Sequence, residues 1–131
     1  MRRLTYFALC APLMLLTPGA RAADPVPTPL FHLEVRDAPA ENGKVLNMEF
    51  SEIARLDASS SVLVTRKSGG SVSSSMFVLR GMCGLARARG KQNFLPQAVA
   101  GQPGAYIVSF PDAIPPKDKG FSMPQCDLVG Y

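Results

Sequence analysis

The stretch FVLRGMCGLARARGKQNF, residues 77–94, decides the fold. It sets one cysteine among small residues and four basic side chains. Three interpretations compete: a reactive thiol in a positive pocket, a nucleic-acid-binding helix, or a packed helix held by a disulfide. When residues 76–91 are placed on a helix at about 100° per residue, their side chains separate into three strips. Such an orderly separation does not suit a loop and favours the packed helix.

The three strips differ in composition. The first is an apolar arc, made of Leu85, Val78, Met82, Ala86, Leu79 and Cys83. The second is a basic stripe, made of Arg80, Arg87 and Lys91. The third is a strip of small residues, made of Gly81, Gly84 and Ala88. Each glycine destabilises a helix by roughly 1 kcal/mol relative to alanine. We therefore expect the small strip to lie close against a sheet, and Gly90 to end the helix.

The first 22 residues have the three parts of a secretory signal peptide. Arg2 and Arg3 form a positive start, residues 4–16 are apolar, and Ala20 and Ala22 are the small residues that a signal peptidase reads. Thirteen apolar residues are too few to cross about 30 Å of hydrocarbon. We therefore expect a periplasmic or extracellular protein from which residues 1–22 have been removed, with no membrane span left.

Two cysteines remain after this removal, because Cys10 belongs to the signal peptide. Cys83 and Cys126 are 43 positions apart, and two cysteines in an oxidising compartment most simply form one disulfide. Neighbouring arginines lower the pKa of a thiol. However, the chain has no Cys-x-x-Cys motif, and its single histidine, His32, is distant in sequence. The pattern therefore predicts a disulfide and not a reactive thiol.

The charge disfavours nucleic-acid binding. Without the three arginines of residues 1–22, the net charge falls from +4 to +1, which gives little long-range attraction to phosphate. The charges are unevenly placed, since residues 24–57 carry seven acids and three bases, and residues 58–111 carry six bases and no acid. We favour an arrangement in which the two blocks face each other. The alternative leaves one block, including the basic stripe, open as a contact surface.

Five segments are predicted to be strands. Residues 30–35 and 60–67 have strand composition. Residues 94–100 and 105–110 form a hairpin around a Gly-Gln-Pro-Gly turn, with Pro96 indicating an edge or a bulge. Residues 45–56 fit two periods: Leu46, Met48, Phe50 and Glu52 share one side of a strand, while a helical period fits Leu46, Phe50, Ile53 and Ala54. We choose the strand.

The remaining segments read as connections around a single domain of residues 30–131. Residues 23–29 form a proline-rich leader, and residues 37–44 form a turn centred on Asn42 and Gly43. Residues 68–75 are expected to be a flexible connection whose serines cap the following helix. Residues 111–120 read as an exposed loop, and residues 121–131 as a short tail held by Cys126.

A helix that contains a cysteine, followed by ARARGKQNF and a hairpin, resembles a recurring unit in small exported proteins of Gram-negative bacteria. The resemblance covers residues 76–110. It implies the helix–hairpin layout, and these proteins have no assigned activity, so it transfers no catalytic residue.

No sequence motif points to catalysis. His32 and Glu34 share one face of a strand, an arrangement that can orient an imidazole, but a strand histidine without a role is commoner. Glu49 and Glu52 read as solvated charges and not as a catalytic pair. The serines occur in no nucleophile motif, and the Ser-Gly-Gly-Ser segment lacks the lysine and spacing of a phosphate loop. No cofactor or metal is expected.

The residues therefore predict an α+β domain, with an antiparallel sheet of four or five strands and one principal helix packed on a face. We expect a non-enzymatic secreted or periplasmic domain that binds a protein or an envelope polymer. A structural or accessory envelope protein is the alternative, and a hydrolase without a recognisable motif fits less well. The residues specify neither the partner nor the oligomeric state.

Overall fold

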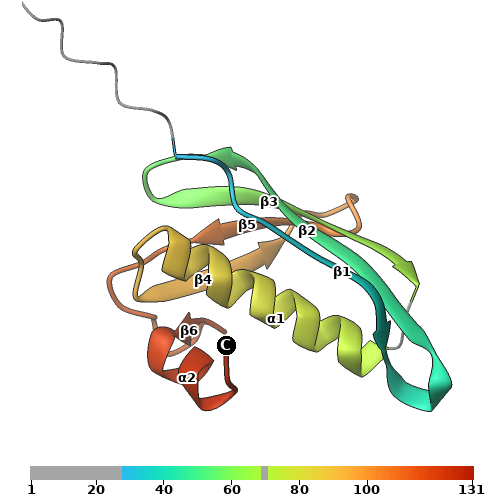
Figure 1. Cartoon of the computed structure of the whole chain (residues 1–131). Helices are drawn as coiled ribbons and strands as arrows, with labels where there is room; N and C mark the ends of the chain where they lie inside the picture. The colour runs from blue at the N-terminus through green and yellow to red at the C-terminus, as the bar shows by residue number, and fades with distance from the viewer. Residues whose placement is uncertain (1–27, 69–70) are drawn as a thin grey trace, which may run out of the picture.

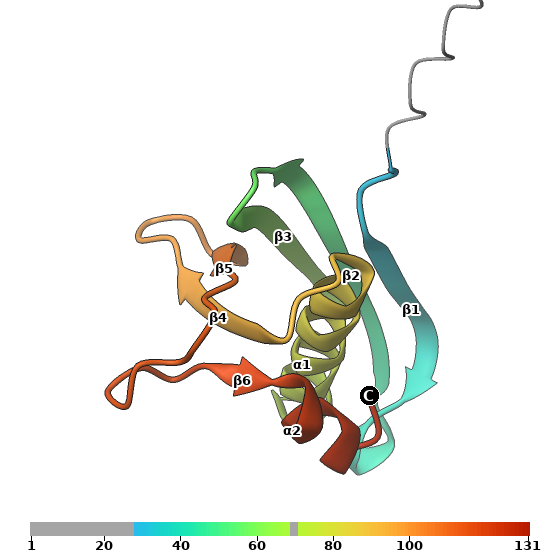
Figure 2. The same cartoon turned by 90° about the vertical axis from the view of Figure 1, so that its left-hand side faces the viewer.

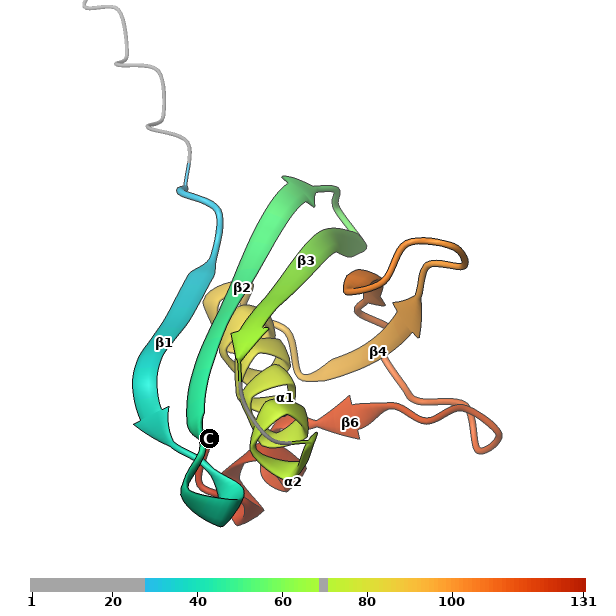
Figure 3. The same ribbon diagram turned by 90° about the vertical axis from the view of Figure 1, so that its right-hand side faces the viewer.

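The computed structural model describes residues 28–68 and 71–131, so the expected signal peptide and most of the leader lie outside the described residues. Its strands form one antiparallel sheet in the order β1-β2-β3-β5-β4-β6, which curls into a half-barrel (Figure 1). The strands are β1 (His32–Pro39), β2 (Val45–Arg55), β3 (Ser59–Ser68), β4 (Asn93–Ala98), β5 (Ala105–Ser109) and β6 (Phe121–Ser122). The helices are α1 (Ser71–Ala88) and α2 (Met123–Leu128), and a 3-10 turn covers Glu41–Gly43. Figures 2 and 3 show α1 lying between the β1–β3 arm and the β4–β6 side of this sheet.

The predicted α+β class is confirmed, but the expected four or five strands are wrong, because the described residues form six. The missed strand is β6, whose two residues pair with Asn93 and Phe94 of β4. Two residues are too few to show the alternation that is typical of a strand. The pairing of β6 with β4 depends instead on the position in which the disulfide holds the C-terminal segment. The expected short tail is thus a strand followed by the helix α2.

The strand interpretation of residues 45–56 is confirmed by the alternation of burial along β2. Leu46, Met48, Phe50 and Glu52 are buried and point toward α1, while their neighbours are more exposed. Ile53, which the helical alternative would bury, is 56% exposed. The β4–β5 hairpin is also confirmed.

The first strand is longer than expected, because a β-bulge between Val35 and Ala38 lets it continue through the predicted turn. Asp37 adopts a φ of 49° within this bulge and donates its main-chain N–H to Asn47 Oδ1 at 2.9 Å. Only the centre of the expected turn forms, with Asn42 and Gly43 both at positive φ.

Helix α1 begins at Ser71, so residues 71–75 belong to the helix and not to a flexible connection. Its first turn is capped by a distant residue. Glu41 accepts the main-chain N–H of Ser73 at 2.7 Å and its hydroxyl at 3.0 Å. Main-chain N–H groups, its own and that of Ser73, lower the pKa of Glu41. The helix ends at Ala88, and Gly90 takes the expected positive φ of 64°.

The small strip of α1 lies against the sheet, as expected for two of its three members. A Cβ atom at Gly81 would overlap the ring of Phe50, and one at Gly84 would lie 2.7 Å from Cζ of Phe31. Ala88 is exposed at the end of the helix. The glycines therefore let α1 approach β2 closely enough to bury Phe50 completely.

The predicted pairing of Cys83 and Cys126 is present in the structure. Their Cα atoms are 5.9 Å apart, within the range for a disulfide, and both side chains are buried. The bond joins α1 to α2. The start of α2 is set locally, because Gln125 Oε1 accepts the main-chain N–H of Ser122 at 2.8 Å.

Candidate binding groove

A hollow of about 760 Å³ opens between the N-terminal half of α1, the second half of β3 and the start of β5, and we call it the groove. Its apolar and aromatic residues include Met48, Val64, Val78 and Tyr106, and its polar ones include Thr65 and Arg66. It is also lined by Leu63, Ser74, Ser75, Pro103 and Gly104.

The groove exists because β3 and β5 differ in length. β3 has ten residues and β5 has five, so their pairing runs only from Ser59–Ser109 to Leu63–Ala105. One further hydrogen bond follows, from the N–H of Val64 to the carbonyl of Gly104 at 2.7 Å. Beyond it, β3 continues to Ser68 while β5 has ended. This side of β3 is therefore an open strand edge.

Packing beneath α1 changes at the same place. Under the C-terminal half of the helix, Leu85, Val62 and Val108 are at most 1% exposed. Near the N-terminal half, Val78 and Tyr106 are only half-buried. The face of α1 that packs against the sheet thus extends past the point where the sheet covers it, and this leaves an apolar floor open to solvent.

The groove follows the edge of β3 and not just one of its faces. Four consecutive residues, 63–66, line it, although alternate side chains of a strand point to opposite faces. Since hydrogen-bonding direction also alternates, the N–H of Arg66 points to the same side as that of Val64. The groove therefore presents main-chain groups along one wall and apolar side chains on its floor.

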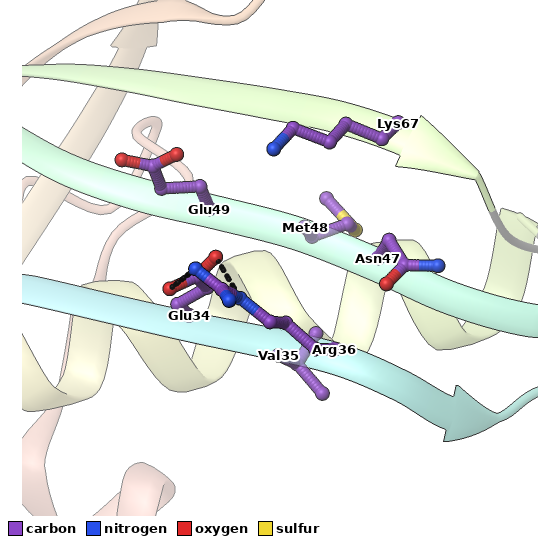
Figure 4. Close-up of a pocket in the computed structure, with 7 residues that line it drawn as sticks. All are labelled: Glu34, Val35, Arg36, Asn47, Met48, Glu49 and Lys67. Carbon is purple, nitrogen blue, oxygen red and sulfur yellow. Dashed lines mark hydrogen bonds and ion pairs between the residues drawn. The ribbon is translucent and has the colours of Figure 1, made fainter.

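The groove carries positive charge. Arg66 is exposed and, within residues 28–68 and 71–131, its side chain makes no hydrogen bond or ion pair. No acidic residue lines the groove, and none occurs in residues 58–111. Lys67 belongs to the opposite face of the sheet, where it borders a hollow of about 300 Å³ with Glu34, Arg36 and Glu49 (Figure 4).

Two members of the basic stripe, Arg80 and Arg87, lie on the exposed side of α1, and Lys91 follows the end of the helix. Arg87 donates to Asp127 Oδ1 at 3.1 Å and to the main-chain oxygen of Tyr131 at 2.8 Å. Arg87 thus has an acidic partner from outside residues 58–111, because the disulfide brings the C-terminal segment back to the helix. Arg80 is exposed and Lys91 is half-buried, with no side-chain hydrogen bond or ion pair for either in the described part of the chain.

Glu52 contradicts the expectation of a solvated charge, since its side chain is fully buried. It accepts hydrogen bonds from Arg55 at 2.6 and 2.9 Å, from the hydroxyl of Ser60 at 2.7 Å and from the main-chain N–H of Phe31 at 2.9 Å. Arg89 Nη1 lies 3.8 Å away. Burial raises the pKa of Glu52, but the hydrogen bonds from Arg55, Phe31 and Ser60 outweigh it and lower the pKa to about 2.

Arg89 completes this cluster from the end of α1. It donates to the main-chain oxygens of residues 56, 57 and 59 at 2.6, 3.1 and 3.0 Å, and to Ser60 Oγ at 2.7 Å. Its guanidinium also lies 5.1 Å from the centre of the Phe110 ring. No buried side-chain nitrogen or oxygen of the described residues lacks a hydrogen-bond partner. The cluster therefore ties the β2–β3 turn, the start of β1 and the end of α1 together, and its hydrogen bonds give it a structural role.

His32 contacts β2 and not Glu34. Its Nδ1 lies 3.1 Å from Ser51 Oγ and 3.7 Å from Glu49 Oε1, while Ser51 donates to Glu49 at 3.3 Å. Glu34 instead accepts from Arg36 at 2.6 Å, and this hydrogen bond lowers the pKa of Glu34 (Figure 4). A hydrolytic triad needs the serine and the carboxylate at opposite ring nitrogens. Here both lie at Nδ1, so this arrangement does not activate Ser51.

Comparisons with known proteins add no assignment: no family model, no curated protein and no solved structure matches the chain. Within residues 28–68 and 71–131, no three His, Cys, Asp or Glu side chains gather where they would hold a metal ion. Among the helices of the same residues, none combines the length and apolar character that crossing a membrane requires.

The groove is the candidate site that the sequence did not predict. The available signal was a difference in length, since the predicted strand of residues 60–67 exceeds its eventual partner at residues 105–110. This difference in length produces a groove only when the two segments pair directly. The order of strands in a sheet cannot be read from the periodicity of a sequence.

Proposed function

We propose that the protein is a non-enzymatic binding domain of the cell envelope, which holds a protein or an envelope polymer partner in the groove. The observation that carries the proposal is the groove itself, an open apolar floor beside Arg66, whose side chain has no partner among the residues that the structure describes. By contrast, Glu52 and Glu34 are already paired within the domain, with Arg55 and Arg36 respectively.

The N-terminal sequence and the disulfide support an exported location, in the periplasm or outside the cell. Residues 1–22 have the pattern of a signal peptide, and a disulfide is stable in an oxidising compartment. The bond also makes the C-terminal segment part of the domain, since residues 121–122 add a strand to β4. A small domain that is held by a disulfide and carries an open groove is a suitable form for a binding protein.

Capture of a partner from envelope extract tests this proposal when the groove is blocked. Val78→Arg places a long charged side chain over the groove floor, and we expect it to abolish capture. Ile53→Arg is the matched control, because Ile53 is 56% exposed and does not line the groove. Circular dichroism and thermal melting of both variants check that each has folded. Equal capture by the two variants would contradict a role for the groove.

The alternatives give different results in the same experiment. A structural or accessory envelope protein would show no saturable partner whose binding depends on Val78. A hydrolase would consume an envelope substrate, and the His32–Ser51–Glu49 contacts on the outer face give no support for such turnover. Arg80→Glu and Lys91→Glu test the basic stripe separately, since a partner that docks on the stripe would be lost in these variants and kept in Val78→Arg.

A further inference from the structure

We infer that the groove takes a short, extended, acidic segment of a partner protein, which adds as a strand to the open edge of β3 and pairs a carboxylate with Arg66. The inference rests on the proposed function, because it names the chemistry of a partner for the same groove. Three properties of the groove support it: an unpaired strand edge, an apolar floor and an unbalanced positive charge.

The open edge of β3 favours a peptide over a polymer that has no peptide main chain. Pairing between β3 and β5 ends at Leu63–Ala105, and the last hydrogen bond reaches Val64. From residue 65 to the end of β3, this side of the strand offers main-chain donors and acceptors that pair with no strand of residues 28–68 and 71–131. An extended peptide supplies complementary groups at the same spacing, which is the basis of strand addition.

The apolar floor of the groove can contact every second side chain of such a peptide. Side chains of an added strand point alternately toward and away from the face that α1 covers. Those that point inward would meet Val64, Val78 and Tyr106, which are half-buried and therefore have apolar surface left to cover. We expect small or medium apolar residues at these alternate positions, since the hollow of about 760 Å³ is shared by several of them.

The positive charge of the groove favours an acidic residue in the bound peptide. Arg66 has no side-chain partner in the part of the chain that the structure describes, and no acid lines the groove. A carboxylate placed beside a guanidinium forms hydrogen bonds stronger than neutral ones. Lys67 provides a natural comparison, because it is the adjacent residue with the same charge and lines a hollow on the other face.

The test measures binding of defined peptides to the purified mature protein by calorimetry and by amide shifts in NMR spectra. The probe is a capped peptide of about eight residues, the length of an ordinary strand, in which valines and one glutamate near the end share one face and threonines occupy the other. Valine and glutamate share a face because Arg66 and Val64 point to the same side of β3. One comparator replaces glutamate by lysine. A second keeps the glutamate but carries N-methyl groups on alternate amides, which preserves the charge and removes the donors for strand pairing.

We expect the glutamate peptide to bind, and both comparators to bind at least about tenfold more weakly. Arg66→Glu should weaken binding of the glutamate peptide by about tenfold or more, while Lys67→Glu changes it by less than about twofold because it faces the opposite side. Hydrogen exchange at the amide of residue 66 should slow when the peptide is bound.

Three results would overturn the inference: no binding of the glutamate peptide at millimolar concentration, equal binding of the N-methylated or lysine peptide, or unchanged binding by Arg66→Glu. The experiment with Val78→Arg separates this failure from failure of the proposed function. If Val78→Arg loses envelope capture while no acidic peptide binds, the groove still binds a partner, but one of different chemistry. If capture survives in Val78→Arg and no peptide binds, both proposals fall.

Discussion

Single residues hold this domain together through buried charges as well as apolar packing. Glu52 lies at the centre of a cluster in which Arg55, Ser60, Arg89 and the N–H of Phe31 surround one carboxylate. Burying an ion pair destabilises a protein unless the geometry and the additional hydrogen bonds offset the loss of water. Here every buried polar side-chain atom among the described residues has a partner, so the condition is met.

The low pKa of Glu52 predicts that the domain loses stability in acid. Because the folded state lowers this pKa from 4.5 to about 2, the ionised carboxylate stabilises the fold above about pH 4.5. That contribution, roughly 3 kcal/mol, disappears as the pH falls from 4.5 toward 2. Urea unfolding at a series of pH values measures the effect.

Two variants make this prediction specific. Glu52→Gln should lower the free energy of unfolding at neutral pH by about 3–5 kcal/mol, because it leaves two arginines without their buried partner. It should also flatten the pH dependence between 4.5 and 2. Glu49→Gln, on the same strand but more exposed, should change stability by less than about 1 kcal/mol. Equal effects of the two variants would show that Glu52 is not the buried partner of the arginines.

Replacing either of two glycines in α1 by alanine should change the stability of the domain by different amounts. Gly81→Ala forces a methyl group into the completely buried ring of Phe50 and should destabilise the domain by about 1–3 kcal/mol. Gly84→Ala meets the far end of the Phe31 ring, which is half-buried and has room to shift. Its gain in helix propensity, about 1 kcal/mol, should offset that contact. Thermal melting of both variants provides the comparison, and a more stable Gly81→Ala would contradict the packing of α1 on β2.

At the scale of elements, the C-terminal segment depends on α1 for its position. β6 has two residues and α2 has six, and neither is long enough to be stable alone. The disulfide and the contacts of Arg87 with Asp127 and Tyr131 hold them. The segment is thus a strap across the end of α1, and its loss would expose Cys83 and Phe94.

Removal of the disulfide should therefore loosen the strap before the sheet. Cys126→Ser should speed proteolysis after Lys117 and Lys119, which lie in the exposed loop before β6, and lower the melting temperature by several degrees. In the chain-entropy model, a bond that closes 43 residues contributes about 4 kcal/mol. Thiol labelling of the native, unreduced protein should find no free cysteine. A freely labelled Cys83 would contradict the pairing and make a reactive thiol the better interpretation.

At the scale of the whole molecule, the two charge blocks face each other only in part. Arg89 crosses to Glu52, as the expected opposition of acidic and basic segments requires. Arg87 pairs instead with Asp127, and Arg66 and Arg80 have no partner within the described residues. The unbalanced charge therefore collects at two places, the groove and the outer side of α1.

Export is the prediction that concerns the chain as a whole. If residues 1–22 are a signal peptide, mass spectrometry of envelope protein should find a chain that begins at Ala23 or one residue later. Ala22→Arg should block this cleavage, because the peptidase reads a small residue there. Recovery of the protein only in the cytosol with Met1 intact would contradict the location, and with it the proposed envelope function.

The sequence alone determined five of the six strands, most of α1 and the disulfide pair. The periods of α1, β3 and β5, the turn at Asn42 and the helix end at Gly90 depend on neighbouring residues, so they are visible in a linear pattern. The pairing of Cys83 with Cys126 followed from there being two cysteines outside residues 1–22. Only the tertiary structure decided that Glu52 is buried and that Glu41 caps α1, because both depend on partners distant in sequence. It also decided the groove, since an open edge appears only when a strand of ten residues pairs with one of five. Strand order and relative length belong to the assembled sheet, and no single segment contains them.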